Sequence, residues 1–475
     1  MKSTKTLQSR RGFRLAQCLV RGLPTRNLWH VPAFGFVTCS DVLGVFGRHR
    51  AHEGTLSGKK VAIWLSDSFR LSTLLVFLDG LCESLILIPE GSTAGQADGL
   101  LKAGQADYLF HGDRDSVSCK EISTGEELFE FDFAGFGEHR STSLSVEREA
   151  ETRWIIPTSG TSGAPRLVAH SLTTLTRTSR TSEARGHEFC WGLLYSLSRF
   201  AGLQVFFQAL LGHSTLVLVN PSDPLDHNIS CLAESGCNAL SATPTMWRRI
   251  LMSPAGDKLA LRQITLGGEI ADQKLLDVLG KTFPAARIVH VFASTEAGVG
   301  FSVADGQAGF PAAYIKNPPG DVEISVDSEG CLCLRPQVAG QNYNRGGETI
   351  FDKNGWVRTG DLVRNVGNRF VFLGRDSGCI NVGGNKVHPE EVEQVLMEFS
   401  KVADAHVKGI KNPIMGFLVA ADIVPTLEVE DKQELEKELL QLCRSRLEPY
   451  KVPVLIRFVE ETAVSETGKV RRTLG

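Results

Sequence analysis

Short apolar runs alternate with amphipathic segments from residue 59 onward. Residues 60–65 form an apolar run typical of a buried strand, residues 69–83 carry the apolar spacing of a helix, and residues 85–89 form a second apolar run. A strand, a helix and a strand in this order are typical of a β-α-β unit. The pattern therefore predicts a parallel sheet with helices packed on its faces.

The same alternation returns further along the chain. Residues 191–211 predict a helix, and the apolar residues 215–219 predict the strand that follows it. A second pair follows, with a helix at residues 274–279 and a strand at residues 288–292. These pairs indicate that the α/β architecture extends over most of the first three hundred residues.

Beyond Pro318 the pattern changes to alternating apolar and polar positions. Residues 321–326 and 331–335 predict paired strands, which is consistent with a smaller β subdomain. No internal repeat is evident along the chain.

The last hundred residues predict a separate small unit. Pro389 opens a helix over residues 390–399, with acidic side chains near its positive end. A strand at residues 417–423 and a charged helix at residues 432–446 follow. We therefore predict a boundary near residues 374–378. The two predicted domains are residues 1–374 and residues 375–475.

Composition and charge exclude some functions. The 475 residues are 42% hydrophobic and 22% charged, with a formal net charge of -3, so we expect no broad nucleic-acid binding. The two most apolar later runs, residues 71–89 and 191–220, both contain charged side chains, so we expect no membrane span. Eleven cysteines without a Cys-x-x-Cys pair favour a reducing compartment, and we expect a cytoplasmic protein.

The N-terminal segment is basic and carries no acidic residue before Asp41. It loosely resembles a transit peptide, and residues 9–13 loosely resemble a twin-arginine signal. Arg14, Arg21 and Arg26 interrupt the apolar region that a secretory signal requires. The pattern favours a basic arm or a first helix.

A loop rich in hydroxyl groups and glycines follows the apolar run at residues 154–157. Glycines let backbone N–H groups approach an anion, hydroxyl groups add donors, and Arg166 adds a fixed charge. The Walker spacing GxxxxGK[ST] is absent, so this is a phosphate loop of another kind, or a polar surface turn. The candidate phosphate ligands are Thr158, Ser159, Gly160, Thr161, Ser162, Gly163 and Arg166.

Further segments resemble motifs of one enzyme superfamily, in the same order along the chain. They are Phe292-Ala293-Ser294-Thr295-Glu296 for Tyr-Gly-x-Thr-Glu, residues 355–361 for GWxxTGD, residues 374–375 and 380–387 for an interdomain segment with a glycine loop, and residues 467–471 for a terminal lysine motif. Together with the phosphate loop, they resemble the adenylate-forming superfamily over roughly residues 56–474. That superfamily contains acyl- and aryl-CoA ligases, adenylation domains of peptide synthetases, and luciferases.

The resemblance implies a fold and a reaction. The fold is α/β, with a large multi-sheet N-terminal adenylation domain and a small mobile α+β C-terminal lid domain. In the reaction a small carboxylic acid and ATP form acyl-AMP and pyrophosphate. The small C-terminal domain then rotates so that CoA accepts the acyl group. Charge accumulates at the α-phosphorus and on pyrophosphate, so catalysis depends on positioning and electrostatic stabilisation.

The resemblance also assigns roles to residues. Lys469 would be the catalytic lysine, Thr295 would contact the α-phosphate, and Glu296 would hold Mg2+. Glu296 as a mere loop cap and Lys469 as a solvated tail residue are the alternatives. The implied nucleotide contacts are Gly268, Glu269, Phe292, Ala293, Ser294, Asp361 and Arg375. Gly383 and Gly384 would line the path of CoA, and Arg199, Phe200, Gly202 and Gly267 would surround the acid.

Four residues depart from the superfamily pattern. Arg166 replaces a lysine and keeps its charge in a planar fork. Phe292 replaces a tyrosine and either stacks on adenine or packs as a core aromatic. Arg199 stands where a histidine or an aromatic is usual, and either pairs with a second carboxylate on the substrate or turns away. Ser377 stands at the hinge in place of Asp or Lys.

Three functions remain open at this stage. The leading hypothesis is an acid–thiol ligase that uses ATP, Mg2+ and CoA. The second keeps adenylation but transfers the acyl group to an amine, another nitrogen nucleophile or the thiol of a separate carrier protein. The third is a nucleotide-binding pseudoenzyme, against which the presence of Thr295, Glu296, Asp361 and Lys469 argues.

Overall fold

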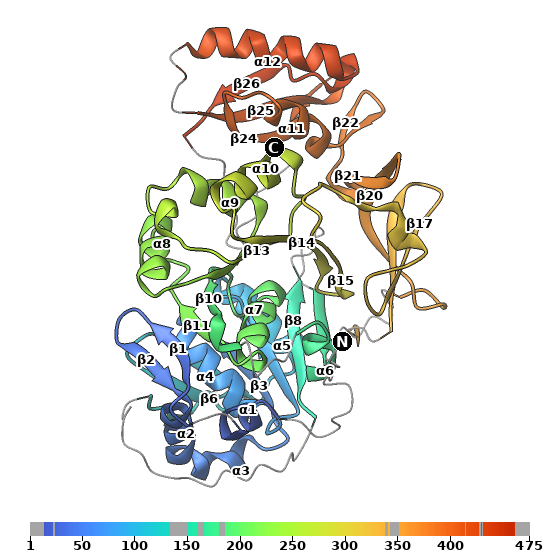
Figure 1. The fold of residues 1–475 in the computed structure, drawn as a ribbon. Coiled ribbons are helices and arrows are strands. Elements are labelled where there is room, and N and C mark those ends of the chain that lie inside the picture. Colours follow the sequence, from blue (N-terminus) through green and yellow to red (C-terminus); the bar gives the residue numbers. More distant parts are fainter. Residues whose placement is uncertain are drawn as a thin grey trace.

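A computed structural model shows a large domain with several sheets and, at one end of the molecule, a smaller unit coloured orange to red (Figure 1). The residues that it describes are 14–21, 24–133, 151–158, 166–179, 186–337, 341–342, 351–413, 415–426, 429 and 431–460.

The first β-α-β unit predicted from the sequence is confirmed. β3 (Lys60–Trp64) and β4 (Ser84–Leu87) pair in parallel, and α4 (Ser68–Leu78) connects them. The helix ends earlier than predicted, because Gly80 adopts a φ of +81° that an α-helix does not continue. The strand order across this eight-stranded sheet is β19 (Gln341–Asn342), β9 (Arg166–His170), β8 (Arg153–Thr158), β4, β3, β5 (Tyr108–Gly112), β6 (Val117–Glu121) and β7 (Glu127–Glu130).

The second eight-stranded sheet corrects one prediction. The sequence pattern predicts a single helix over residues 191–211, but the structure has β10 (Cys190–Leu193) followed by α7 (Phe200–Leu211). A continuous apolar run carries no period that separates a strand from a helix, and β10 is a central strand with partners on both sides. The order is β15 (Gly298–Val303), β14 (Arg287–Ser294), β13 (Gln263–Gly267), β12 (Ala239–Ala242), β10, β11 (Thr215–Leu218), β1 (Asn27–Val31) and β2 (Gly35–Thr38).

Helices of the large domain cover these sheets (Figure 1). α4 and α7 are apolar on nearly all sides, and one core cluster joins their side chains to strands of both sheets. The expected first helix is α1 (Ala16–Arg21). The others are α2 (Cys39–Arg48), α3 (Glu53–Leu56), α5 (Ala94–Gly104), α6 (Leu172–Thr176), α8 (Leu225–Glu234), α9 (Pro244–Met252) and α10 (Gln273–Thr282), with 3-10 turns at Arg50–His52, Gly186–Glu188, Gly256–Lys258 and Ala312–Ile315. Two further 3-10 turns, Asp376–Gly378 and Pro449–Lys451, lie in the C-terminal part of the chain.

The predicted β subdomain is a five-stranded antiparallel sheet. Its strands at residues 322–326 and 331–336 agree with the predicted strands to within a residue. The order is β16 (Phe310–Pro311), β21 (Arg369–Arg375), β20 (Val357–Val366), β18 (Cys331–Pro336) and β17 (Val322–Val326). A separate core cluster rich in phenylalanine lies against this sheet.

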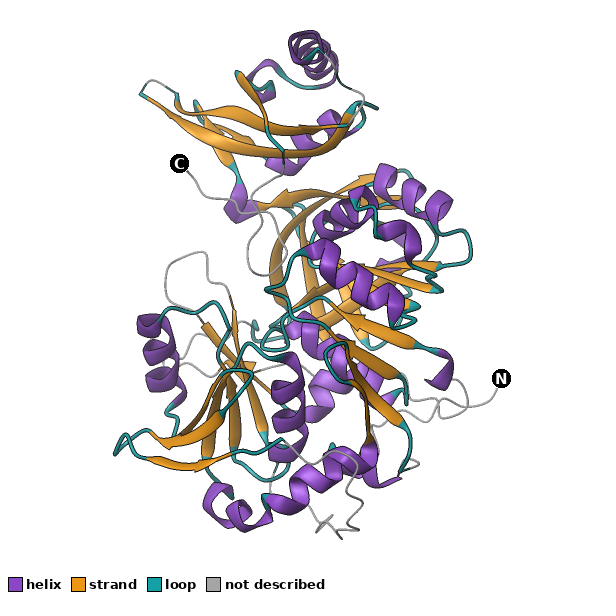
Figure 2. Cartoon of the chain, turned by 90° about the vertical axis from the view of Figure 1, so that its left-hand side faces the viewer, coloured by secondary structure: helices purple, strands orange, loops and turns teal. Residues whose placement is uncertain are grey.

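The small unit has a sheet and a core of its own, and Figure 2 shows it stacked above the large domain. Its core cluster draws on residues from Ile380 to Ile456. The elements are β22 (Ile380–Val382), β23 (Asn385–Val387), α11 (Pro389–Met397), β24 (Val402–Asn412), β25 (Gly416–Pro425), α12 (Lys432–Arg446) and β26 (Leu455–Phe458). The helices and the long strand predicted here from the sequence are confirmed.

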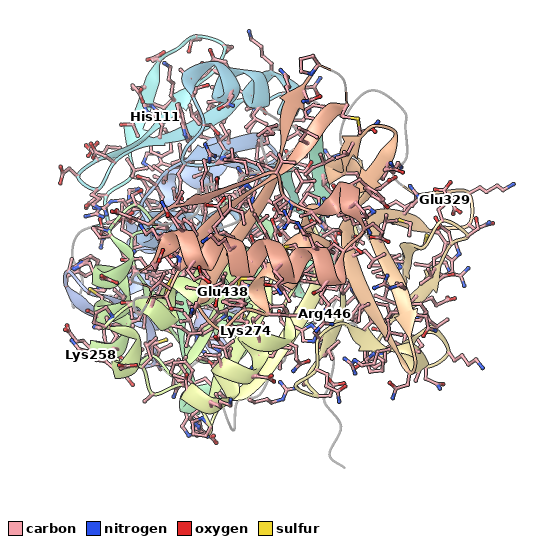
Figure 3. All side chains as sticks on the ribbon, turned by 90° about the horizontal axis from the view of Figure 1, so that it is seen from above. His111, Lys258, Lys274, Glu329, Glu438 and Arg446 are labelled. Atoms are coloured by element: carbon pink, nitrogen blue, oxygen red, sulfur yellow. The ribbon has the colours of Figure 1, made fainter. Side chains whose placement is uncertain are left out.

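The small unit rests on α9 and α10 of the large domain. Nζ of Lys274 donates hydrogen bonds to the carbonyl oxygens of Phe399 and Val402, both at 2.9 Å. Arg248 of α9 lies 3.8 Å from a carboxylate oxygen of Asp404 on β24. The view from above in Figure 3, which labels Lys274, shows α12 lying across the large domain.

All eleven cysteines lie within the described residues, and all are free thiols. Over the described ranges, no helix combines the length and the apolar character that crossing a bilayer would require.

Candidate active site

The predicted phosphate loop joins two antiparallel strands. β8 ends at Thr158, β9 begins at Arg166, and these two residues face each other in the strand register. The strand predicted to feed the loop is therefore confirmed, while phosphate binding stays a prediction. Outside the described residues lie Ser159, Gly160, Thr161, Ser162, Gly163 and the side chain of Arg166.

The turn that carries Thr295 and Glu296 is bound to the same hairpin. It joins β14 to β15 in the other large sheet, and Oγ of Ser294 accepts a hydrogen bond from the backbone N–H of Ala297 at 3.0 Å. Nε2 of His170, the last residue of β9, lies 2.7 Å from the carbonyl oxygen of Thr295. The structure thus brings together two motifs that the sequence separates by more than a hundred residues.

His170 is a positioning residue that the sequence analysis missed. Its side chain is buried, and a carbonyl oxygen only accepts, so Nε2 carries the proton that it donates to Thr295. Burial lowers the pKa of His170 to about 4, and the hydrogen bond to Thr295 only partly opposes that shift. The ring packs 5.7 Å from that of Phe200. A polar residue ending an apolar strand just after the loop was the only sequence signal.

We expect His170 to make the protein less stable in mild acid. The unfolded chain binds a proton at a pKa near 6.5 and the folded chain at about 4, so the stabilisation present above pH 6.5 is lost as the pH falls toward 4. The full loss is roughly 3 kcal/mol. His170→Gln, which keeps an N–H donor but does not titrate, should reduce the slope of unfolding free energy against pH by about one proton. Substitution of the exposed His227 by Gln is the control, and an unchanged slope in His170→Gln would contradict this role.

Asp361 and Arg375, both predicted nucleotide contacts, lie side by side. They face each other on β20 and β21, and Nε of Arg375 donates to Oδ1 of Asp361 at 3.1 Å. The side chain of Asp361 is 13% exposed and that of Arg375 is 54% exposed. The arginine thereby holds the carboxylate in one orientation at the end of the strand pair.

Phe292 packs within the aromatic cluster of the five-stranded sheet. Its ring lies 5.4 Å from the rings of both Phe301 and Phe372, at interplanar angles of 14° and 10°. These contacts favour the interpretation of Phe292 as a core aromatic. Its neighbour Ala293 packs instead against the core between the two large sheets.

Glu269 caps a helix. Its Oε2 accepts a hydrogen bond from the backbone N–H of Thr245 at 3.0 Å, at the start of α9. Gly267 offers its carbonyl oxygen to the Tyr195 hydroxyl at 3.4 Å, and Gly268 turns the chain with a φ of +84°. The segment is thus a tight turn after β13 that also caps α9, and the nucleotide contacts of Gly268 and Glu269 stay predictions.

Three further residues predicted to surround the acid lie at or near the start of α7. Nη1 of Arg199 lies 3.5 Å from the carbonyl oxygen of Pro157. Its guanidinium is thus next to the phosphate hairpin, the β8–β9 pair that flanks the predicted phosphate loop. Phe200 is buried beside His170. Gly202 serves close packing, because a Cβ there would lie 2.1 Å from the carbonyl oxygen of Ser196.

Glu296 suits a magnesium ion that arrives with ATP. Among the described residues its carboxylate has no hydrogen bond or ion pair. Mg2+ bound to nucleotides keeps several waters and takes one or two protein carboxylates. Within the same described residues, no group of three His, Cys, Asp or Glu side chains is placed to hold a metal.

Sequence comparison identifies the family. The sequence model described as AMP-binding enzyme matches residues 61–347, which is more than half of the chain. The chain belongs to the AMP-binding enzyme family. A second model, the AMP-binding enzyme C-terminal domain, matches residues 391–469.

Named proteins resemble this AMP-binding enzyme over nearly its whole length. A 2-succinylbenzoate–CoA ligase of Bacillus cereus is 26% identical over 89% of each chain. The anthranilate CoA ligase AuaEII, solved with anthranoyl-AMP, aligns with a TM-score of 0.74 at 18% identity over 98% of this chain and 96% of that one. The amide bond synthetase McbA of Marinactinospora thermotolerans aligns with a TM-score of 0.73 at 20% identity, over 96% and 97%.

These matches confirm three predictions for this AMP-binding enzyme. The superfamily, the α/β fold class with its large and small domains, and the enzyme class of ATP-dependent acid–thiol ligases agree with the sequence analysis. The individual site residues, the domain boundary and the magnesium ion stay predictions.

The lid residues of this AMP-binding enzyme are described in part. Gly383 and Gly384 form the turn between β22 and β23, where the N–H of Gly383 donates to the carbonyl oxygen of Met415 at 2.9 Å. The backbone of Ser377 lies in the 3-10 turn that follows Arg375. The side chain of Ser377 and the whole of Lys469 lie outside the described residues.

Proposed function

We propose that the protein activates a small carboxylic acid with ATP and transfers the acyl group to CoA. The observation that carries the proposal is the direct bond from the phosphate hairpin to the Thr295–Glu296 turn through His170. This bond holds a threonine and an acidic residue against the two strands that flank the glycine-rich segment of the sequence. Such a neighbourhood supports a site for a nucleotide whose α-phosphate is attacked while pyrophosphate leaves.

In the first step, a carboxylate oxygen of the acid attacks the α-phosphorus of ATP. The bond between the α-phosphorus and the bridging oxygen breaks, and pyrophosphate leaves with the electron pair. Thr295 donates to the α-phosphate, Asp361 and Arg375 hold the ribose, and Lys469 neutralises the leaving oxygen. Glu296 would hold Mg2+, which would neutralise phosphate charge when ATP is bound.

In the second step, the thiol sulfur of CoA attacks the acyl carbon. The bond between the acyl carbon and the phosphate oxygen breaks, AMP leaves with the electron pair, and the thiol proton passes to solvent. Gly383 and Gly384 leave room for the pantetheine arm after the small domain, residues 375–475, has rotated about Ser377. We place the reaction in the cytoplasm because all eleven thiols are free.

Pyrophosphate exchange tests the first step. Purified protein with Mg2+ and ATP should exchange labelled pyrophosphate in the presence of one acid from a panel of aromatic and short aliphatic acids. Because curated relatives are named 2-succinylbenzoate–CoA ligases, 2-succinylbenzoate belongs in that panel. ATP binding without exchange by any acid would favour a pseudoenzyme.

Mass spectrometry of the product tests the acceptor. The fold shared with an amide bond synthetase keeps an amine acceptor as the second candidate. With CoA, ammonia, simple amines and a carrier protein offered separately, we expect an acyl-CoA and release of AMP. An amide or an acyl carrier protein formed in preference would replace CoA as the acceptor.

A further inference from the structure

Arg177 follows α6 and lies against the turn that carries Thr295 and Glu296. Its Nη2 donates a hydrogen bond to the carbonyl oxygen of Val299 on β15. A Cβ added at Gly298 would lie 3.9 Å from this Nη2 and 4.0 Å from Cζ of Phe200. The guanidinium and the tip of the Phe200 ring therefore border the same small space beside the catalytic turn.

The guanidinium of Arg177 has more donors than partners. It offers five N–H groups, and among the described residues the Val299 carbonyl is its one hydrogen-bond acceptor. No carboxylate of those residues pairs with it, although the charge of Asp321 acts on it from further away. Burial lowers its pKa, and a partly buried cation with donors to spare is stabilised by an anion.

The position of Arg199 makes Arg177 the better candidate for a second carboxylate of the acid. The sequence suggested Arg199 as the cation for a second carboxylate on the acid, but its Nη1 lies next to the Pro157 carbonyl at the phosphate hairpin. Arg177 reaches instead the glycine side of the turn, two residues beyond Glu296. The chain thus has Arg199 beside Pro157 and Arg177 beside Val299.

We propose that Arg177 is a specificity-determining residue that binds a second carboxylate of the acid substrate. The inference rests on the proposed function, since it concerns the acid that this enzyme adenylates. One carboxylate of a dicarboxylic acid lies at the α-phosphate, and the other accepts two N–H groups of the guanidinium fork. A monocarboxylic acid of the same shape leaves those donors without an anion.

Paired substrates test the proposal. Each dicarboxylic acid of the exchange panel, short aliphatic or aromatic, is compared with its mono-amide, which keeps the shape and loses the second charge. The wild-type enzyme should prefer the diacid by about 10²-fold in kcat/KM, because a hydrogen-bonded ion pair replaces a neutral contact. Arg177→Leu should remove this preference, and Arg177→Lys should keep part of it, since it keeps the charge without the fork.

Arg369→Leu is the matched control. This arginine is also partly buried and donates to backbone carbonyl oxygens, those of Ala308, Gln307 and Gly309, but it is ion-paired with Asp305 and lies on the five-stranded sheet. The control should leave the preference for the diacid unchanged even if it lowers the melting temperature.

Three results would overturn the proposal. The first is a wild-type enzyme that prefers the mono-amides. The second is an equal loss of kcat/KM for both members of each pair in Arg177→Leu, which is what a purely structural clamp on Val299 predicts. The third result applies if Arg177→Leu does not fold: an Arg177→Lys enzyme that prefers the diacids as strongly as the wild-type enzyme. Exchange with no acid at all would instead overturn the proposed function itself.

Discussion

Lys469→Ala is expected to slow acyl-AMP formation by about 10²- to 10³-fold, because it removes a fixed positive charge from the oxygen on which negative charge develops. Transfer of the acyl group from preformed acyl-AMP to CoA should largely persist, since the proposed domain rotation withdraws the lysine before the thiol arrives. The C-terminal family model extends to this residue, which supports its alignment with the terminal lysine motif. Pyrophosphate exchange measures the first half-reaction, and single-turnover mixing of synthetic acyl-AMP with CoA measures the second.

Lys437→Ala is the control for this experiment. Lys437 lies on α12 of the same domain, and its side chain is 76% exposed. Its removal should change neither half-reaction. A Lys469→Ala enzyme that loses both half-reactions equally would contradict the assigned role and indicate damage to the small domain.

The regular elements could be predicted from the sequence where their period was clear. The charged helix at residues 432–446 has the predicted bounds, because its apolar side chains recur at helical spacing between polar ones. β10 was missed because residues 191–211 are apolar at most positions, as is usual both for a central parallel strand and for a buried helix. Only the neighbouring strands decide between the two, and their positions cannot be found from local sequence.

In the candidate site, too, local sequence predicts some residues and not others. Motifs supplied Thr295, Glu296, Asp361 and Arg375, because short segments with distinctive residue types carry them. His170 has no such signal, since its importance comes from a hydrogen bond to a backbone carbonyl of a distant segment, and any residue type could supply that carbonyl.

Arginine positions were the hardest to predict. The sequence contains many arginines, and a guanidinium at the end of a long side chain can reach several neighbours. Arg199 was chosen for its place in a motif, but its position at the N-terminus of α7 directs it to Pro157. Arg177 was not predicted, because its hydrogen bond goes to a backbone carbonyl of β15, in another sheet and more than a hundred residues away.

The contact between the two domains depends on a buried arginine. Arg248 of α9 pairs with Asp272 of the large domain and with Asp404 of β24, and all three side chains are nearly buried. Burial lowers the pKa of Arg248, but the charges of Asp272, Asp404, Glu269 and Glu393 more than offset this and hold the pKa above its ordinary value. The arginine is therefore a charged link between the two domains.

Arg248→Met is expected to destabilise the protein by about 3–5 kcal/mol, because removing one partner of a buried ion pair leaves the other charge uncompensated. Asp404→Asn should cost less, since Asp272 still pairs with Arg248. Chemical unfolding of both single variants and the double variant gives the coupling energy. Because Asp404 belongs to the small domain, hydrogen exchange in β24 should rise in both single variants. If Arg248→Met unfolds at the same denaturant concentration as the wild-type protein, the arginine does not stabilise the interface. Lys274 with its two carbonyl partners would then be the main contact.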